Sequence, residues 1–146
     1  MVYGHLTGLM ALRDRLMTDA ALNGLFLSAY NKEPVHFVGL KSSFAATDYP
    51  YLCYVPNTAK RGEMAGDIEV ISVLIGVYDK TVNAGVSLGA INLAMASEAV
   101  VKALPSVLKN GAAVTWLGTV SEATDLQVAH PLYQKEIQIP LRVRML

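Results

Sequence analysis

The stretch DIEVISVLIGVYDK, from Asp67 to Lys80, decides the fold of this chain. Apolar residues occupy both of its alternating sets of positions, a pattern typical of a strand that is covered on both faces. About 12 residues at roughly 3.3 Å each span some 40 Å, close to the diameter expected for a domain of this size. Helices of the same chain can cover one face of this strand, but we expect that covering both faces requires a second subunit. One set comprises Ile68, Val70, Leu74 and Tyr78, and the other Ile71, Val73, Ile75 and Val77.

Length and composition bound the class of protein. With 146 residues, the chain is long enough for one domain, which we expect to span residues 1–146. Charged residues make up 16% and hydrophobic residues 53%, so apolar surface should remain for partners. No apolar run is long enough to span a bilayer, and the first residues lack the pattern of a secretory signal. We therefore expect no membrane partner and a protein made in the cytoplasm.

The charge balance argues against tight binding to nucleic acid. Twelve basic and twelve acidic residues give a formal net charge of zero, and no basic cluster is present. Such a surface provides no strong electrostatic attraction for phosphates. If DNA passes near this protein, we expect it to be held loosely.

The remaining segments predict an α+β fold with a largely antiparallel sheet, one long central strand and two main helices. Leucines at three- and four-residue spacing indicate a first helix over Leu6–Leu16, followed by a short turn that ends at Asn23-Gly24. Similar spacing predicts the second main helix between Val86 and Leu104. We interpret the polar segment Asn57–Gly66 as an exposed loop. Further strands are expected at Val35–Leu40, Tyr49–Pro56, Ala112–Val120 and Tyr133–Val143.

The last strand alternates strictly between apolar and polar residues. Tyr133, Ile137, Ile139, Leu141 and Val143 fall on one face, while Gln134, Glu136, Gln138, Arg142 and Arg144 fall on the other. This pattern predicts a half-buried strand. Pro140 cannot donate a ladder hydrogen bond, which favours an edge strand or a bulge there.

Motifs for catalysis or cofactor binding are missing from the sequence. It contains no phosphate-binding glycine motif, and His5, His36 and His130 lie in separate segments without metal-ligand spacing. Cys53 lies between aromatic residues, so we expect an inert, buried thiol with a raised pKa. Asp67, Glu69 and Asp79 lie at the ends of the long strand and are expected to meet solvent. We predict no catalytic residues, no metal, no cofactor and no enzymatic activity.

Two roles are possible for the clustered tyrosines, for Trp116 and for the basic residues. Tyr49, Tyr51 and Tyr54 suit the core or an interface better than a ligand platform, and Trp116 suits a core anchor first and an interface second. Arg142 and Arg144, with Lys60 and Arg61, form a solvated surface or face a neighbouring subunit or channel.

The order of these segments resembles the tail terminator, or tail completion, proteins of long-tailed bacteriophages. The resemblance lies in the N-terminal helix with Leu12, Arg15 or Leu16, Asp19 and Leu22, and in the segments YPYL (Tyr49–Leu52) and VYDK (Val77–Lys80). It continues in a helix after a short gap and in the C-terminal strand, and so covers nearly the whole chain.

The resemblance implies a structural virion protein located in the tail or neck. Such proteins form hexameric rings with an α+β fold that cap the tail tube, end its polymerisation and join the tail to the head connector. The implied partners are further copies of the chain, the tail tube protein and a head-tail connector or neck protein, with DNA at most passing through the lumen. The family has no catalytic residues.

Edge-strand logic then gives hypotheses for contact residues. We expect the subunit interface to use Val70, Leu74, Ile75, Arg142 and Arg144, and the loop with Lys60, Arg61 and Glu63 to contact an adjoining ring. Three alternatives remain open. They are another neck or tail-tube component, a small-ligand-binding or enzymatic α+β dimer whose tyrosines line an apolar pocket, and a cellular interaction module.

Overall fold

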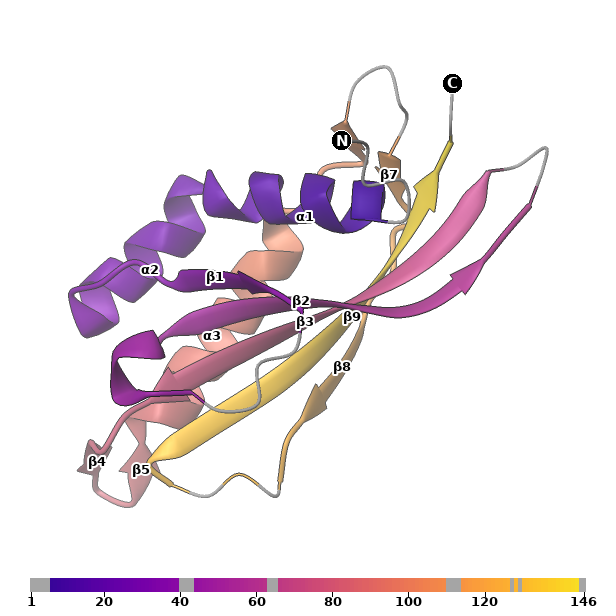
Figure 1. Cartoon of the computed structure of the whole chain (residues 1–146). Coiled ribbons are helices and arrows are strands. Elements are labelled where there is room, and N and C mark those ends of the chain that lie inside the picture. The colour runs from indigo at the N-terminus through magenta and orange to yellow at the C-terminus, as the bar shows by residue number, and fades with distance from the viewer. Residues whose placement is uncertain are drawn as a thin grey trace.

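The computed structural model describes residues 6–39, 44–62, 66–109, 114–126, 128 and 130–144. Seven strands form one curled sheet in the order β1-β2-β3-β9-β7-β6, and β8 also pairs with β9 (Figure 1). Only the β1–β2 pair is parallel among these strands. The strands are β1 (Val35–Val38), β2 (Tyr51–Lys60), β3 (Asp67–Tyr78), β6 (Val107–Lys109), β7 (Val114–Trp116), β8 (Ser121–Thr124) and β9 (Leu132–Val143).

Three α-helices of the described residues pack on one face of this sheet. They are α1 (Thr7–Met17), α2 (Ala20–Tyr30) and α3 (Leu88–Lys102). A short 3-10 helix, η2 (Ala46–Asp48), precedes β2, and a small hairpin of β4 (Val82–Asn83) and β5 (Val86–Ser87) leads into α3. The predicted α+β class and the largely antiparallel sheet are confirmed.

The core lies between the helices and every second residue of the long strands. Ile71, Val73 and Ile75 of β3 are at most 2% exposed, and each faces the helices because successive strand residues point to opposite faces. The core-facing residues of β9 lie directly opposite these residues: Ile137 lies opposite Val73, and Ile139 lies opposite Ile71. Full burial of a side chain of this size contributes about 1.5–3 kcal/mol each. Asp67–Lys80 thus builds the centre of the core, as predicted.

The C-terminal strand is an interior strand, which corrects the expectation of an edge. β9 pairs with β3 along its whole length and with β7 and β8 on its other side. Pro140 is tolerated because it lies between the segments that pair with β7 and β8, and its carbonyl accepts a hydrogen bond from the Leu117 N–H at 3.1 Å. The nitrogen of a strand residue points to the same side as its carbonyl, so the missing N–H faces this gap.

The end of the second helix differs from the sequence prediction. Asn23-Gly24 does not end a helix but lies inside α2, because the Asp19 carboxylate caps the helix by accepting from the Leu22 N–H at 2.9 Å. The helix ends instead at Asn31, which adopts a left-handed conformation with φ 55°.

The first part of the predicted loop Asn57–Gly66 is a continuation of the sheet. Asn57 to Lys60 belong to β2, which continues through a bulge between Pro56 and Thr58. The polar stretch SEAT, for which no strand is predicted, forms β8 along the edge of β9. Polar strands such as these carry no hydrophobic period, so periodicity misses them.

Candidate functional site

The face of β2, β3 and β9 that points away from the helices is the candidate assembly surface, and we call it the open face. Several of its apolar side chains are only half-buried, whereas Ile71, Val73 and Ile75 beneath the helices are buried. Strand residues with this incomplete cover comprise Val55, Ile68, Val70, Leu74 and Pro140. The expectation that one face of the long strand needs cover from outside the chain agrees with this arrangement.

A hydrogen-bonded network crosses the open face. The Ser72 hydroxyl donates to the Glu136 carboxylate at 2.5 Å, and the Asn57 amide donates to the Ser72 oxygen at 2.9 Å. The Gln138 amide adds a weaker bond to Glu136 at 3.4 Å. These residues come from three neighbouring strands, so the network ties β2, β3 and β9 into one register. Sequence reasoning missed it because partners on different strands are recognised only once the register is known.

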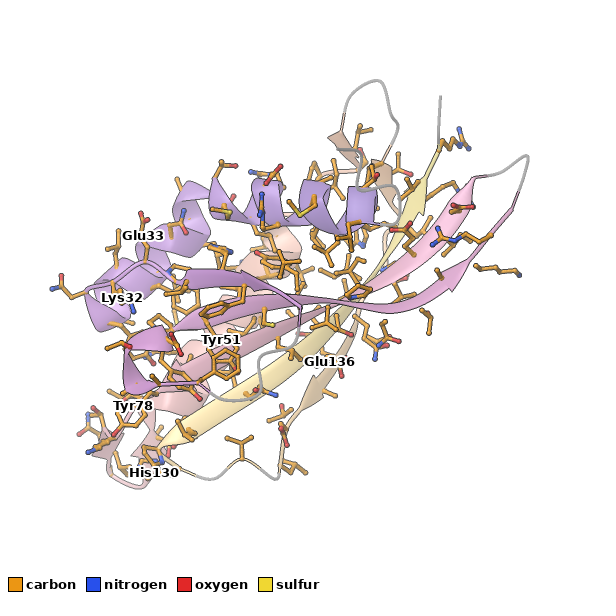
Figure 2. The ribbon with its side chains drawn as sticks, in the orientation of Figure 1. Lys32, Glu33, Tyr51, Tyr78, His130 and Glu136 are labelled. Atoms are coloured by element: carbon orange, nitrogen blue, oxygen red, sulfur yellow. The ribbon has the colours of Figure 1, made fainter. Side chains whose placement is uncertain are left out.

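An aromatic cluster closes one end of the open face. Tyr51 is 1% exposed and stacks on Phe44, with ring centroids 4.0 Å apart. Its hydroxyl donates to the Gln134 side chain at 2.5 Å, and burial raises its pKa. Tyr51 and Glu136, labelled in Figure 2, lie on this same face. Tyr49 adds an edge-on contact to Tyr51, so these tyrosines pack on one another, as the core-or-interface reading predicted.

The predicted interface residues divide between the two faces. Val70, Leu74 and Arg142 lie together on the open face, and Arg142 Nε is buried without a hydrogen-bond partner among the described residues. Arg144 is exposed just after β9. Ile75 points the other way, into the core, with no exposed surface. Ile75 is therefore a core residue of this chain, and its prediction as an interface residue is wrong.

The hairpin of β2 and β3 extends beyond the helices, and we call its outer part, Pro56–Lys60 with Asp67–Val70, the arm (Figure 1). Arg61 follows β2 and bridges two carboxylates, Asp67 at 2.8 Å and Glu69 at 3.0 Å. Glu69 is 3% exposed, which corrects the expectation that it meets solvent. Glu63 lies outside the described residues.

The cysteine and the histidines have structural partners. Cys53 is buried, burial raises its pKa, and its thiol donates to the Gly39 carbonyl at 3.0 Å, so the prediction of a buried thiol with a raised pKa is confirmed. His36 shares a 2.8 Å hydrogen bond with the Tyr54 hydroxyl, and burial lowers its pKa to about 4. His130 contacts the Tyr133 hydroxyl at 2.6 Å. His5 lies outside the described residues.

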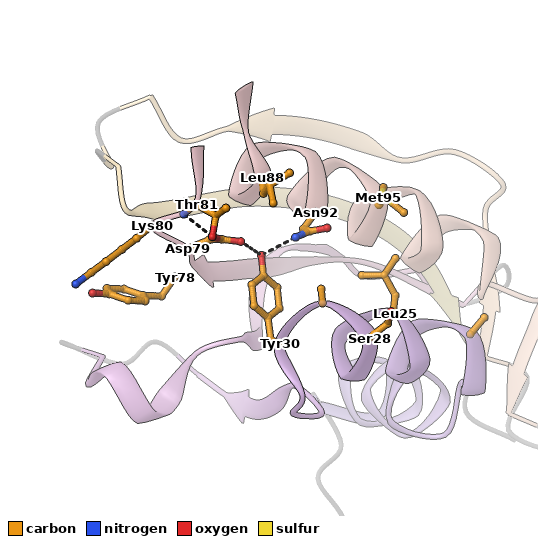
Figure 3. A pocket seen from close by; sticks show the side chains of 12 residues that line it. Leu25, Ser28, Tyr30, Tyr78, Asp79, Lys80, Thr81, Leu88, Asn92 and Met95 are labelled. Carbon is orange, nitrogen blue, oxygen red and sulfur yellow. Dashed lines mark hydrogen bonds between the residues drawn. The ribbon is translucent and has the colours of Figure 1, made fainter. Parts of the chain in front are cut away.

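A groove of about 740 Å³ runs between α2 and α3 (Figure 3). At one end the Tyr30 hydroxyl donates to the Asp79 carboxylate at 3.0 Å and accepts from the Asn92 amide at 3.1 Å. Burial raises the pKa of Tyr30, and Met95 and Leu25 supply apolar walls. No sequence motif marks this trio, whose members lie on α2, α3 and the residue after β3.

The described residues provide neither a metal-binding cluster nor a membrane-spanning helix. No group of three or more His, Cys, Asp or Glu side chains is placed to hold a metal ion there. None of the helices in that part of the chain is long and apolar enough to cross a membrane.

Comparison with known proteins finds a similar fold among solved structures. No family model matches this chain, and no curated protein sequence matches it. Among solved structures, the fold is similar to a chain from the structure described as "Virion of native gene transfer agent (GTA) particle", with a TM-score of 0.53 and 16% sequence identity. The match covers 97% of this chain and 98% of the other. At this identity the likeness establishes a shared fold over nearly the full length of both chains.

Proposed function

We propose that this chain is a non-enzymatic structural protein of a phage-like particle, located in its tail or neck. The observation that carries the proposal is the end-to-end fold similarity to a chain of a gene transfer agent virion. The resemblance of the sequence to tail terminator proteins supports the same conclusion independently.

Within that role, we propose a hexameric ring that caps the tail tube, ends tube polymerisation and presents the surface that joins the head connector. Support comes from the open face, where the half-buried residues Val70, Leu74 and Arg142 lack cover from the chain's own helices, and where Arg142 Nε has no hydrogen-bond partner among the described residues. Apolar strand surface of this kind is usually buried against another protein. The partners are other copies of the chain, the tube protein and a connector or neck protein.

A test of the capping role uses the phage or phage-like element that encodes this chain. Deleting its coding sequence should give tubes of abnormal length, seen by electron microscopy, and tails that fail to join heads. Restoring the wild-type chain should restore both properties. Normal tubes joined to heads in the deletion strain would contradict the proposal.

The groove between α2 and α3 favours a second candidate function, that of a ligand-binding dimer. Tyr30, Asp79 and Asn92 converge on this groove, as polar groups do in small-molecule sites. These groups, however, already satisfy one another by hydrogen bonds. A compact dimer in native mass spectrometry, with a retained small molecule, would favour this competitor over the ring.

A further inference from the structure

The groove between α2 and α3 is longer than the part drawn in Figure 3. A second hollow of about 320 Å³ shares Ala21, Leu25 and Met95 with the first, so the two form one channel along the helices. Met95 is 49% exposed on its rim. Small side chains at Ala21, Ala29 and Ala99 line it, which lets a partner backbone approach closely. We call the whole channel the helix groove.

At one end of the helix groove lies the Asp79 carboxylate, which no cation among the described residues neutralises. Although burial pushes the pKa of Asp79 upward, hydrogen bonds from the Thr81 N–H and the Tyr30 hydroxyl hold it below its usual value. Lys80 does not neutralise it, because the Lys80 ammonium lies over the Tyr78 ring, 5.7 Å from its centre. Asp79 forms no ion pair with a described residue. A cation supplied from outside would therefore be favoured here.

The arm carries two carboxylates, Asp67 and Glu69, which pair with Arg61, and it also carries Lys60. Lys60 is exposed and makes no ion pair with any described residue. It shares the open-face side of the arm with Thr58, since these residues lie opposite Ile68 and Val70 in the register. β1 pairs only with Tyr51–Tyr54, so no described strand flanks the outer edge of β2 from Val55 to Lys60. Six residues at about 3.3 Å give roughly 20 Å of strand that pairs with β3 on one edge and with no described strand on the other.

We propose that the arm of one copy docks in the helix groove of the next copy, with Lys60 directed at Asp79. This inference rests on the proposed ring. The arm and α2 lie at opposite ends of the sheet (Figure 1), so the contact joins two different surfaces head to tail. Such heterologous contacts generate closed rings when the rotation between subunits closes. The opposite charges of Lys60 and Asp79 and the small side chains that line the groove favour a second copy as the occupant.

Cysteine cross-linking tests the contact directly. Thr58 of the arm and Ser28 of the groove are exposed, and Cys53 does not interfere because it is buried. The Thr58→Cys/Ser28→Cys double variant should form disulfide-linked ladders under mild oxidation, whereas each single variant should not. Ala59→Cys/Ser28→Cys is the matched control, because Ala59 lies opposite Glu69 on the other side of the arm. Equal ladders from the control would overturn the proposal.

A charge test separates docking from chance collision. Lys60→Glu in the double-cysteine background should lower ladder yield by about tenfold, and Lys60→Arg should preserve it. Rings in native mass spectra without a ladder would overturn the arm contact and leave the proposed ring standing. Monomers without a ladder, both alone and on isolated tail tubes, would overturn both.

Discussion

The two faces of β3 carry similar apolar side chains, but the chain buries only one of them. On the helix side, Val73 and Ile75 have no exposed surface, whereas Val70 and Leu74 on the open face remain half-buried. The difference arises because all three described helices pack on the same face. One face therefore stabilises the monomer, and the other is available to stabilise an assembly. Substitutions on the two faces should have separable effects.

Charge insertion on each face gives the largest contrast. Ile75→Asp places a carboxylate in the core without a partner, and we expect a loss of more than about 4 kcal/mol, enough to prevent folding. Leu74→Asp should cost the monomer far less, because the new carboxylate reaches water. Urea unfolding followed by circular dichroism measures both. Similar unfolding of the two variants would contradict the division between the faces.

A substitution beneath the aromatic cluster should have the next largest effect. A Cβ added at Gly76 would lie 1.9 Å from the Tyr51 ring, so Gly76→Ala must displace that ring from its stack on Phe44. We expect a destabilisation of about 1–3 kcal/mol, as for overpacking in a core. Gly76→Ala with Tyr51→Leu should recover part of the loss in the same unfolding assay. An unchanged midpoint for Gly76→Ala would show that the ring is not held there.

The polar network on the open face should contribute less. Ser72→Ala removes the hydroxyl that joins Asn57 and Glu136, and we expect a cost of about 1–2 kcal/mol from the partners left unsatisfied. Hydrogen exchange should increase at neighbouring amides of β2 and β9. A control at Thr124, an exposed residue of β8, should change little as Thr124→Ala. Equal effects at both positions would argue against the network.

The smallest effect is a gain in stability on the outer surface of the helix layer. Gly24 lies within α2, and a Cβ there would have no neighbour within 4 Å. Gly24→Ala should stabilise the protein by about 0.5–1 kcal/mol, because alanine loses less backbone freedom on folding. Thermal unfolding measures this shift. A lower melting temperature would mean that Gly24 is needed for a reason beyond helix propensity.

Strong periodicity made much of the fold predictable. The two long strands and the helix around Leu93 follow from spacing alone. In the structure, one of the two apolar sets of β3, namely Ile71, Val73, Ile75 and Val77, forms the core. Which face the helices would cover could not be predicted, because both alternating sets of Asp67–Lys80 are apolar. The sequence therefore predicts both Leu74 and Ile75 at the interface, but only Leu74 lies on the open face, and Ile75 points into the core.

Polar elements were harder to predict than apolar ones. β8 and the outer part of β2 have no hydrophobic period, and Pro140 suggested an edge because the gap between β7 and β8 is a tertiary feature. The same limit applies to the candidate sites. Tyr30, Asp79 and Asn92 meet only after α2 and α3 pack together. Ser72 and Glu136 meet only in the correct strand register.

The most direct test of the central claim compares wild type with Leu74→Asp by native mass spectrometry and negative-stain imaging. If the open face is an assembly surface, wild type should give a roughly sixfold mass with ring-shaped particles. Leu74→Asp should give a folded monomer with an unchanged circular dichroism spectrum. Full-sized rings of Leu74→Asp would contradict the claim that this face holds the assembly together.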